Sequence, residues 1–268
     1  MFTRNNAFVL ISDVIMCTPA QIGDYTDFYS SRNHAYNVGC IIRGPDNALQ
    51  DNWSHLPVGY HGRSSSIVVS GKEFPRPRGQ TKPPGSQAPI FSTSERMDYE
   101  LEVGAFLGGQ LNEMGQPIKC SEAEANIFGL VILNDWSARD VQTWEYVPLG
   151  PFNAKNFCSV ISPWIVTLEA LNEFRIPGAK QDPAPLPYLV DPNHFTFDIK
   201  LEVGLKTENS KKAEIITQSN FKYMYWSITQ QIAHHSVTGC NLRAGDLLGS
   251  GKIFFLKIYK NLRNYFWN

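Results

Sequence analysis

The sequence lacks an excess of charge of either sign, a long apolar run and any obvious targeting segment. Its 268 residues include 24 Lys and Arg against 25 Asp and Glu, a formal net charge of −1. Without a basic excess to neutralise phosphates, we expect no nucleic-acid partner. No apolar run approaches the roughly 18 residues that span a bilayer. The apolar stretch at 7–16 is interrupted by Asp13, so we expect neither a signal peptide nor membrane association.

Paired cysteines are also lacking. The five cysteines are scattered, odd in number and show no Cys-x-x-Cys spacing. This pattern favours free thiols in a reducing compartment over disulfides or a thiolate zinc site, so we expect a soluble cytoplasmic protein. The five are Cys17, Cys40, Cys120, Cys158 and Cys240.

Glycine and proline, by contrast, are frequent, with 20 and 17 residues. They cluster between short apolar stretches, which favours many short strands joined by ordered loops over a helical bundle. We therefore predict a mainly β fold with a few short helices. The string Leu-Glu-Val-Gly occurs at 101–104 and at 201–204. Because the surroundings of the two copies differ, we interpret them as two strands and not as a repeat.

Three segments predict strands. Apolar and polar residues alternate over 97–105 and over 195–203, which is the period of a strand with one buried face. Residues 128–133 are continuously apolar apart from Gly129 and predict a buried strand that ends in Asn134-Asp135.

Two segments predict helices. Apolar residues from Phe221 to Ile232 follow helical spacing, with Ser219 as a candidate N-cap and Gly239 beyond the end. A shorter helix is expected to begin at Ser121, where Glu124 would complete a capping box.

Glu100 and Glu102 alternate with apolar residues and therefore project from the same face of the predicted strand, roughly 7 Å apart. Two such carboxylates repel each other unless one is protonated or a cation lies between them. Hard divalent cations prefer oxygen ligands of this kind. The alternative is a solvated strand face, which is how we interpret Asp198, Lys200 and Glu202.

Other ionisable residues are weaker candidates when each is taken alone. Asp135 ends a buried strand, where an acid is either a helix cap or a ligand, and Asp27 lies in a polar and aromatic stretch. Spacing does not show whether these acids converge. Of the six histidines, His34 follows Asp27 by seven residues, and a lone histidine is more often structural than catalytic. His234-His235 ends the predicted helix, where complementing the helix dipole is a sufficient role.

Several motifs, in order along the chain, resemble the fumarylacetoacetate hydrolase family. They are residues 22–32 (IGDYTDFYSSR), 56–63 (LPVGYHGR), 99–102 (YELE), 134–140 (NDWSARD) and 142–152 (QTWEYVPLGPF). The resemblance covers about residues 18–251 and implies a mixed β-sandwich roll, here incomplete at its C-terminal end. We thus divide the chain into an unmatched segment 1–17, a catalytic domain 18–251 and an unmatched basic and aromatic tail 252–268.

The resemblance also implies roles for individual residues, with Mg²⁺ or Ca²⁺ as the cofactor. The implied metal site comprises Asp27, Glu100, Glu102 and Asp135, with Lys155 and Ser159 near a cation. The implied substrate contacts are Tyr29, Arg43, Gln142 and Tyr146. The implied general base is His34, and the implied oxyanion donors are Arg139, Gln142 and Lys155.

The implied reaction is metal-dependent hydrolysis of the carbon–carbon bond of fumarylacetoacetate to fumarate and acetoacetate, the last step of tyrosine and phenylalanine catabolism. A 1,3-dicarbonyl chelates a divalent cation, a base activates water, and donors stabilise the oxyanion. The resemblance further implies a homodimer.

The tail departs from the family. Lys252 lies where the family has a substrate-contacting Thr, and residues 252–268 contain no acid to match the family's Glu that orients the catalytic His. Core strands expected there are missing too, which would leave sheet edges open. Two alternatives therefore stand beside the hydrolase: an inactive truncated product or interaction module, and a related reaction such as decarboxylation of a 2-oxo acid. For the tail itself, the alternatives are a frame-altered or alternatively spliced end and a membrane-surface or partner-binding helix.

Overall fold

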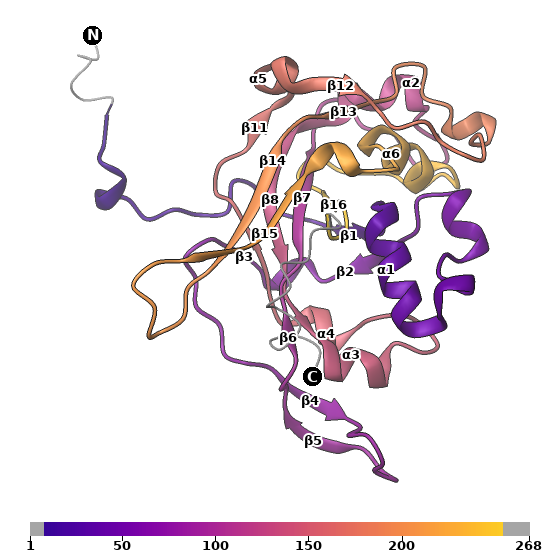
Figure 1. The fold of residues 1–268 in the computed structure, drawn as a ribbon. Helices are drawn as coiled ribbons and strands as arrows, with labels where there is room; N and C mark the ends of the chain where they lie inside the picture. Colours follow the sequence, from indigo (N-terminus) through magenta and orange to yellow (C-terminus); the bar gives the residue numbers. More distant parts are fainter. Residues whose placement is uncertain (1–7, 254–268) are drawn as a thin grey trace.

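The computed structural model describes residues 8–253, and a mixed sheet of eight strands organises them (Figure 1). The strand order is β2-β1-β16-β7-β8-β10-β3, and β11 also pairs with β8. The strands are β1 (Tyr25–Phe28), β2 (Gly59–Gly62), β3 (Ile67–Val69), β7 (Leu101–Leu107), β8 (Ile127–Asp135), β10 (Ser159–Ile161), β11 (Val166–Thr167) and β16 (Leu247–Gly249). Only the pairs β1–β16 and β10–β3 are parallel among those described. The predicted mainly β fold is confirmed.

Four two-stranded ribbons surround this sheet, and the β4–β5 ribbon projects from the body at the bottom of Figure 1. They pair β4 (Arg78–Thr81) with β5 (Ile90–Thr93), β6 (Met97–Asp98) with β9 (Ser137–Ala138), β12 (Arg175–Pro177) with β13 (Phe195–Phe197), and β14 (Lys200–Leu205) with β15 (Glu214–Asn220). The predicted strands 97–105 and 195–203 are confirmed, although each is interrupted and forms two elements. The strand predicted at 128–133 is confirmed as β8.

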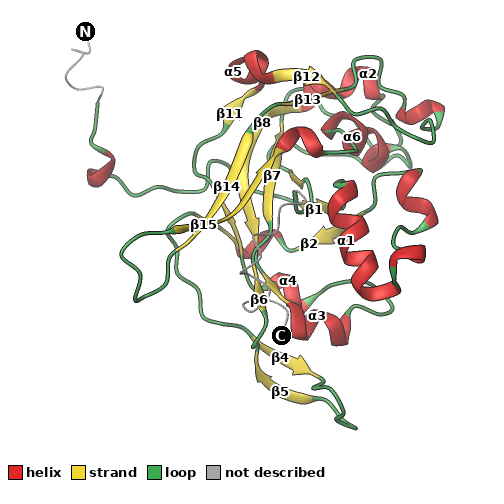
Figure 2. Cartoon of the chain, in the orientation of Figure 1, coloured by secondary structure: helices red, strands yellow, loops and turns green. Residues whose placement is uncertain are grey.

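The helices are short, and Figure 2 shows α1 and α6 together on one side of the long strands. They are α1 (Arg32–Arg43), α2 (Cys120–Ala123), α3 (Arg139–Glu145), α4 (Asn153–Asn156), α5 (Leu168–Leu171) and α6 (Ile228–Ser236). Within residues 8–253, none of them is long and apolar enough to cross a membrane.

Both predicted helix starts are wrong. Ser219 lies in β15, paired with Leu201 of β14, and α6 begins only after Ser227, which forms a capping box with Gln230. Strand pairing at long range therefore overrides the local helical spacing. Ser121 lies inside α2, whose N-cap position is Lys119 without a side-chain cap.

Alternate residues of β7 face two different apolar clusters. Leu101, Val103, Ala105 and Leu107 belong to the larger core, whereas Phe106 belongs to a second cluster with Tyr25 and Leu133. All seven residues of β7 are buried, so the polar Glu102 lies inside the protein and not on a solvated face. The free thiols predicted for the five cysteines are confirmed.

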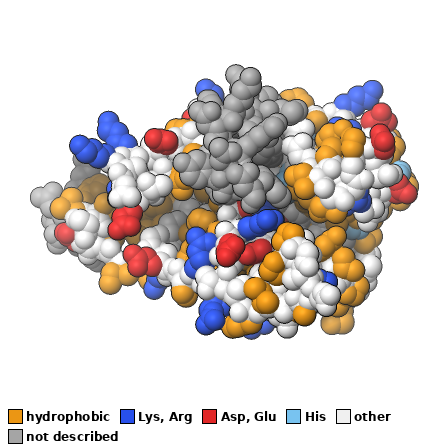
Figure 3. All heavy atoms as spheres, turned by 60° about the horizontal axis from the view of Figure 1, so that its bottom comes forward, with side chains coloured by type: hydrophobic (Ala, Val, Ile, Leu, Met, Phe, Trp, Pro, Cys, Tyr) orange, Lys and Arg blue, Asp and Glu red, His pale blue; other side chains and the backbone are white. Residues whose placement is uncertain are grey.

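Acidic and basic side chains are intermingled on the face of the molecule drawn in Figure 3. Among the described residues on this face, neither sign of charge forms a continuous patch. This distribution agrees with the balanced composition of the chain.

Gly39 fixes the position of α1, the helix that carries His34. A Cβ at Gly39 would lie 1.7 Å from the carbonyl oxygen of Ala48. We therefore expect Gly39→Ala to destabilise the protein by about 1–3 kcal/mol, the usual cost of overpacking, as measured by urea denaturation. The control is Ile42→Ala on the same helix, where the side chain is 51% exposed and about 0.5 kcal/mol or less is expected. Equal losses in the two variants would contradict this close contact.

Candidate metal centre and active site

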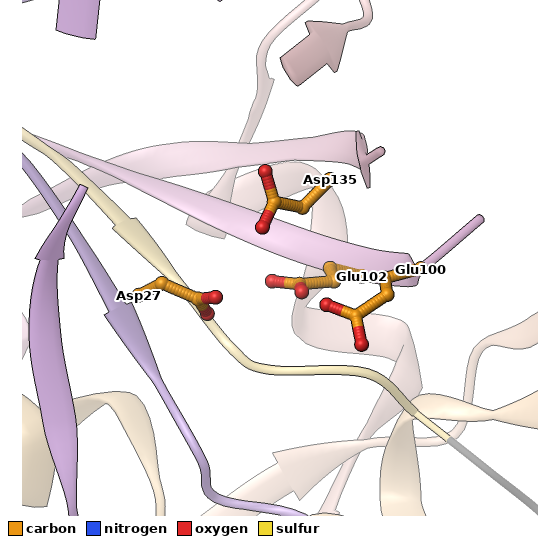
Figure 4. Close-up of side chains that lie close together, drawn as sticks. All are labelled: Asp27, Glu100, Glu102 and Asp135. Carbon is orange, nitrogen blue, oxygen red and sulfur yellow. The ribbon is translucent and has the colours of Figure 1, made fainter. Parts of the chain in front are cut away.

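Four buried carboxylates converge at one end of the sheet (Figure 4). Asp27, Glu100, Glu102 and Asp135 each offer an oxygen atom, and these atoms all lie within 4.8 Å of one another. None of the four residues is more than 4% exposed. The structure thus brings together the four acids that the sequence suggested separately.

The strand order explains this convergence. Asp27 is on β1, Glu102 is on β7 and Asp135 ends β8, while Glu100 directly precedes β7. Because β16 lies between β1 and β7, the Asp27 and Glu102 side chains must meet across it. At this point β16 has Gly249, where a Cβ would lie 2.9 Å from a Glu102 oxygen and 3.3 Å from an Asp27 oxygen. Glycine therefore leaves the space in which the carboxylates meet.

Two oxygens of the cluster have no hydrogen-bond partner among the described residues: Oδ1 of Asp27 and Oε1 of Glu102. The other Asp27 oxygen accepts from Tyr60 at 2.8 Å, and the other Glu102 oxygen accepts from the backbone N–H of Gly251 at 3.0 Å. Burial and the nearby Asp135 raise the pKa of Asp27 to about 8. Burial and the neighbouring carboxylates also raise the pKa of Glu102 well above its ordinary value. This side of the cluster is therefore short of positive charge.

Glu100 and Asp135 lie closer to protein cations. Lys155 forms ion pairs with both, and Ser159 donates a hydrogen bond to Asp135. Burial alone would raise the pKa of Glu100, but Lys155 and Arg139 outweigh this effect and hold it well below its ordinary value. Burial favours a neutral amine at Lys155, yet its two carboxylate partners raise its pKa.

A count of formal charges includes Asp98, which pairs with Arg139 and Lys252. Five carboxylates (Asp98 and the four of the cluster) then face three cations, Arg139, Lys155 and Lys252, which leaves −2. A divalent cation would balance this charge.

The donor set fits a hard divalent cation. Carboxylate oxygens are the ligands that Mg²⁺ and Ca²⁺ prefer, and two of these oxygens are buried without a partner. Asp27, Glu100, Glu102 and Asp135 supply these donors. Lys155, as an ammonium group, has no lone pair to offer and lies beside the donors as a balancing charge. The specific metal roles of these residues stay predictions.

His34 lies next to the cluster, with Nε2 3.7 Å from a Glu100 oxygen. Its ring packs edge-on against Tyr29, with the centroids 5.1 Å apart. Burial lowers the pKa of His34 to about 3, although Glu100 opposes the shift. The imidazole is therefore neutral at physiological pH, with a lone pair on one ring nitrogen.

Arg139 and Gln142 form a pair of donors beside the carboxylates. Arg139 donates from Nη1 to the Gln142 amide oxygen at 2.7 Å, and from Nη2 to Glu100. The Gln142 amide group is thereby oriented with its NH₂ free to donate elsewhere. One Nη1 N–H of Arg139 also has no partner among the described residues.

The structure says less about the other predicted substrate contacts, which are Tyr29, Arg43 and Tyr146. Burial and Glu100 raise the pKa of Tyr29, whereas Arg43 and Arg139 lower it, so both guanidinium groups lie within electrostatic range of the phenol. Arg43 itself donates to the carbonyl oxygens of Asn47 and Ala48. Tyr146, after the end of α3, is 37% exposed.

Sequence reasoning missed two side chains at this site, Tyr60 and Asp98. Tyr60 donates to Asp27 because the antiparallel pairing of β1 and β2 sets the two residues opposite each other. Asp98 binds Arg139 and Lys252. The alternation that selected Glu100 and Glu102 also included Asp98, so the signal for it was present in the sequence.

A matched pair of glutamates tests the metal centre. We expect Mg²⁺ or Ca²⁺ at 100 times its dissociation constant to stabilise the protein by about 2.7 kcal/mol. Glu102→Gln should abolish this gain, as measured by thermal melts. In chelator, the variant should have a melting temperature no lower than that of the unsubstituted protein, because one Glu102 oxygen is buried without a partner among the described residues.

The control is Glu202→Gln in the second Leu-Glu-Val-Gly string, where the side chain is exposed. It should keep the full shift with the cation. An undiminished shift in Glu102→Gln would remove Glu102 from the ligand set.

Comparisons with known proteins agree with this geometry. Residues 25–253 match the family described as fumarylacetoacetate (FAA) hydrolase C-terminal. The fumarylacetoacetases of Dictyostelium discoideum and Homo sapiens are 57% and 56% identical, over 93% of this chain and 59% of their own length. The chain thus spans less than two thirds of these relatives.

Solved structures support the fold alone. A fumarylacetoacetate hydrolase from Exiguobacterium antarcticum superposes with a TM-score of 0.54 at 19% identity, covering 88% of this chain and 65% of that one. A 5-carboxymethyl-2-hydroxymuconate delta-isomerase from Mycobacterium smegmatis gives 0.53 at 16% identity, covering 90% and 72%. With the family match extending over all four clustered carboxylates, the chain belongs to the fumarylacetoacetate hydrolase family.

Proposed function

We propose that this protein hydrolyses the carbon–carbon bond of fumarylacetoacetate, giving fumarate and acetoacetate as in the last step of tyrosine and phenylalanine catabolism. The observation that carries the proposal is the buried carboxylate cluster, with a neutral histidine and free N–H donors beside Glu100. The fumarylacetoacetases that are 56–57% identical support the choice of substrate.

In this proposal, Asp27, Glu100, Glu102 and Asp135 hold a divalent cation, Mg²⁺ or Ca²⁺. When bound, the cation supplies Lewis-acid polarisation to the two oxygens of a 1,3-dicarbonyl. Tyr29 and Arg43 bind the substrate at the His34 side, and Tyr146 binds it from the end of α3.

His34 acts as the general base. Its neutral imidazole takes a proton from water, whose oxygen forms a bond to the carbonyl carbon next to the alkene. Glu100, 3.7 Å from Nε2, stabilises the imidazolium that results. The ring also packs against Tyr29.

The free N–H of Arg139 and the amide of Gln142 donate to the oxyanion that forms on the attacked carbonyl. Lys155 adds positive potential while remaining paired with Glu100 and Asp135. When the carbonyl re-forms, the carbon–carbon bond breaks and its electron pair leaves with acetoacetate as an enolate. The proton held by His34 returns to this carbon.

We also propose that the protein is a cytoplasmic homodimer. The free thiols support a reducing compartment. Phe128 and Ile132 on β8 and Val166 on the adjacent β11 are 55%, 48% and 43% exposed, and such an apolar surface favours association.

The direct test is to express residues 1–268, confirm a folded and monodisperse species, and follow loss of fumarylacetoacetate with Mg²⁺, Ca²⁺ or chelator. Detection of fumarate and acetoacetate in equal amounts by NMR, only with a cation present, is the expected result. A folded protein without turnover would favour the inactive product, and release of CO₂ from a 2-oxo acid would favour the decarboxylase.

His34 gives a sharper test of the mechanism. We expect His34→Gln to lower kcat by about 100-fold or more, since a general base contributes 10²–10⁴-fold, and to keep the thermal shift with the cation. The control is His55→Gln at an exposed histidine outside the site, which should leave kcat unchanged. Unimpaired turnover in His34→Gln would refute the assignment of the base.

A further inference from the structure

Asp98 is buried next to the carboxylate cluster but is not among its four members. A single oxygen, Oδ2, accepts from Arg139 Nε at 3.0 Å and from Nη2 at 2.7 Å. Lys252 Nζ also donates to this carboxylate, at 3.0 Å from Oδ2 and 3.2 Å from Oδ1. The carboxylate is therefore held between two cations.

The backbone fixes Asp98 relative to Arg139. Asp98 on β6 pairs with Ser137 on β9, and Arg139 N–H donates to the carbonyl oxygen of Arg96 at 2.8 Å. Arg139 then begins α3, so its side chain leaves a backbone that is already tied to the strand of Asp98. Because their backbones are connected in this way, the contact between the Asp98 and Arg139 side chains is rigid.

The donors of Arg139 can be counted. Asp98 receives Nε and one N–H of Nη2, Glu100 receives the other, and Gln142 receives one N–H of Nη1. Of the five N–H groups of a guanidinium, only one then lacks a partner among residues 8–253, and its direction is set by the other four. Asp98 accounts for two of those four bonds.

We propose that Asp98 is a positioning residue that holds the Arg139 guanidinium so that its last N–H and the Gln142 amide point at the reacting carbonyl. This inference rests on the proposed function. Lys252 contacts both oxygens of Asp98 and helps to keep its carboxylate in one orientation. Asp98 acts through Arg139 and does not touch the substrate.

Kinetics of Asp98→Asn test the proposal. We expect kcat to fall by about 100-fold, the cost of displacing a catalytic group by about 1 Å. KM should stay within about threefold, because the oxyanion contact exists only in the transition state. The matched control is Asp140→Asn. Asp140 lies on the same helix as Arg139, but its carboxylate accepts hydrogen bonds from Ser94 and from the backbone N–H of Glu95. Equal losses in the two variants would mean that Asp98 has only a structural role.

A double variant separates an action through Arg139 from any other. In an Arg139→Ala background, Asp98→Asn should lower kcat no further, because the group that it positions is gone. A second loss of about 100-fold would overturn the proposal, as it would show a role for Asp98 that is independent of Arg139.

A measurement that does not depend on turnover tests this inference separately from the proposed function. In protein labelled with ¹⁵N-arginine, the Arg139 Nε–H, assigned from Arg139→Ala, should exchange slowly with solvent. Asp98→Asn should accelerate this exchange and Asp140→Asn should not, whether or not the protein hydrolyses fumarylacetoacetate. Slow exchange retained in Asp98→Asn would refute the positioning role. Absence of turnover in the unsubstituted protein would instead refute the proposed function.

Discussion

Mutual repulsion among four buried carboxylates is the constraint on which this site depends. Their ligand oxygens lie within 4.8 Å of one another, where water cannot screen the charge. Within residues 8–253, protein cations form ion pairs on one side of the cluster only: Lys155 binds Glu100 and Asp135, while Asp27 and Glu102 each keep an unpaired oxygen. Burial and the repulsion of Asp135 raise the pKa of Asp27 to about 8, although Lys155 opposes the shift. A fold selected for stability alone would replace such a cluster by apolar side chains.

The sheet holds this cluster because each acid is attached to a strand whose other residues are firmly packed. Phe106 on β7, Leu133 on β8 and Tyr25 on β1 share one apolar cluster beneath the acids. The parallel pairing of β1 with β16 matters most, since it joins residues that are more than 200 positions apart in the sequence. Moving any of these strands by one residue would turn its acid to the opposite face. The register of these strands therefore decides whether the acidic side chains lie together at this end of the sheet.

Part of this arrangement could be predicted from the sequence. Alternation around Glu100 and Glu102 is a local signal and identified both the strand and the shared face. Placing Asp27 and Tyr60 required the strand order, which depends on long-range pairing that no local pattern records. The same limitation explains α6: residues 219–223 follow helical spacing but pair with β14 or form a turn, and the helix begins at Ile228. The roles of the acids came from the resemblance and not from spacing.

The site has two electrostatically different sides, and the proposed mechanism uses both of them. Asp98, Arg139, Lys155 and Lys252 form the cation-rich side, which also holds Glu100 ionised. Asp27 and Glu102 form the side that is short of positive charge. In the proposed function a divalent cation would be held by the four carboxylates, where it would satisfy the two unpaired oxygens of Asp27 and Glu102. His34 borders Glu100, so under the proposed mechanism the water would approach from the cation-rich side. In that mechanism Arg139 and Gln142, the proposed donors to the oxyanion, lie on the side where its negative charge would form.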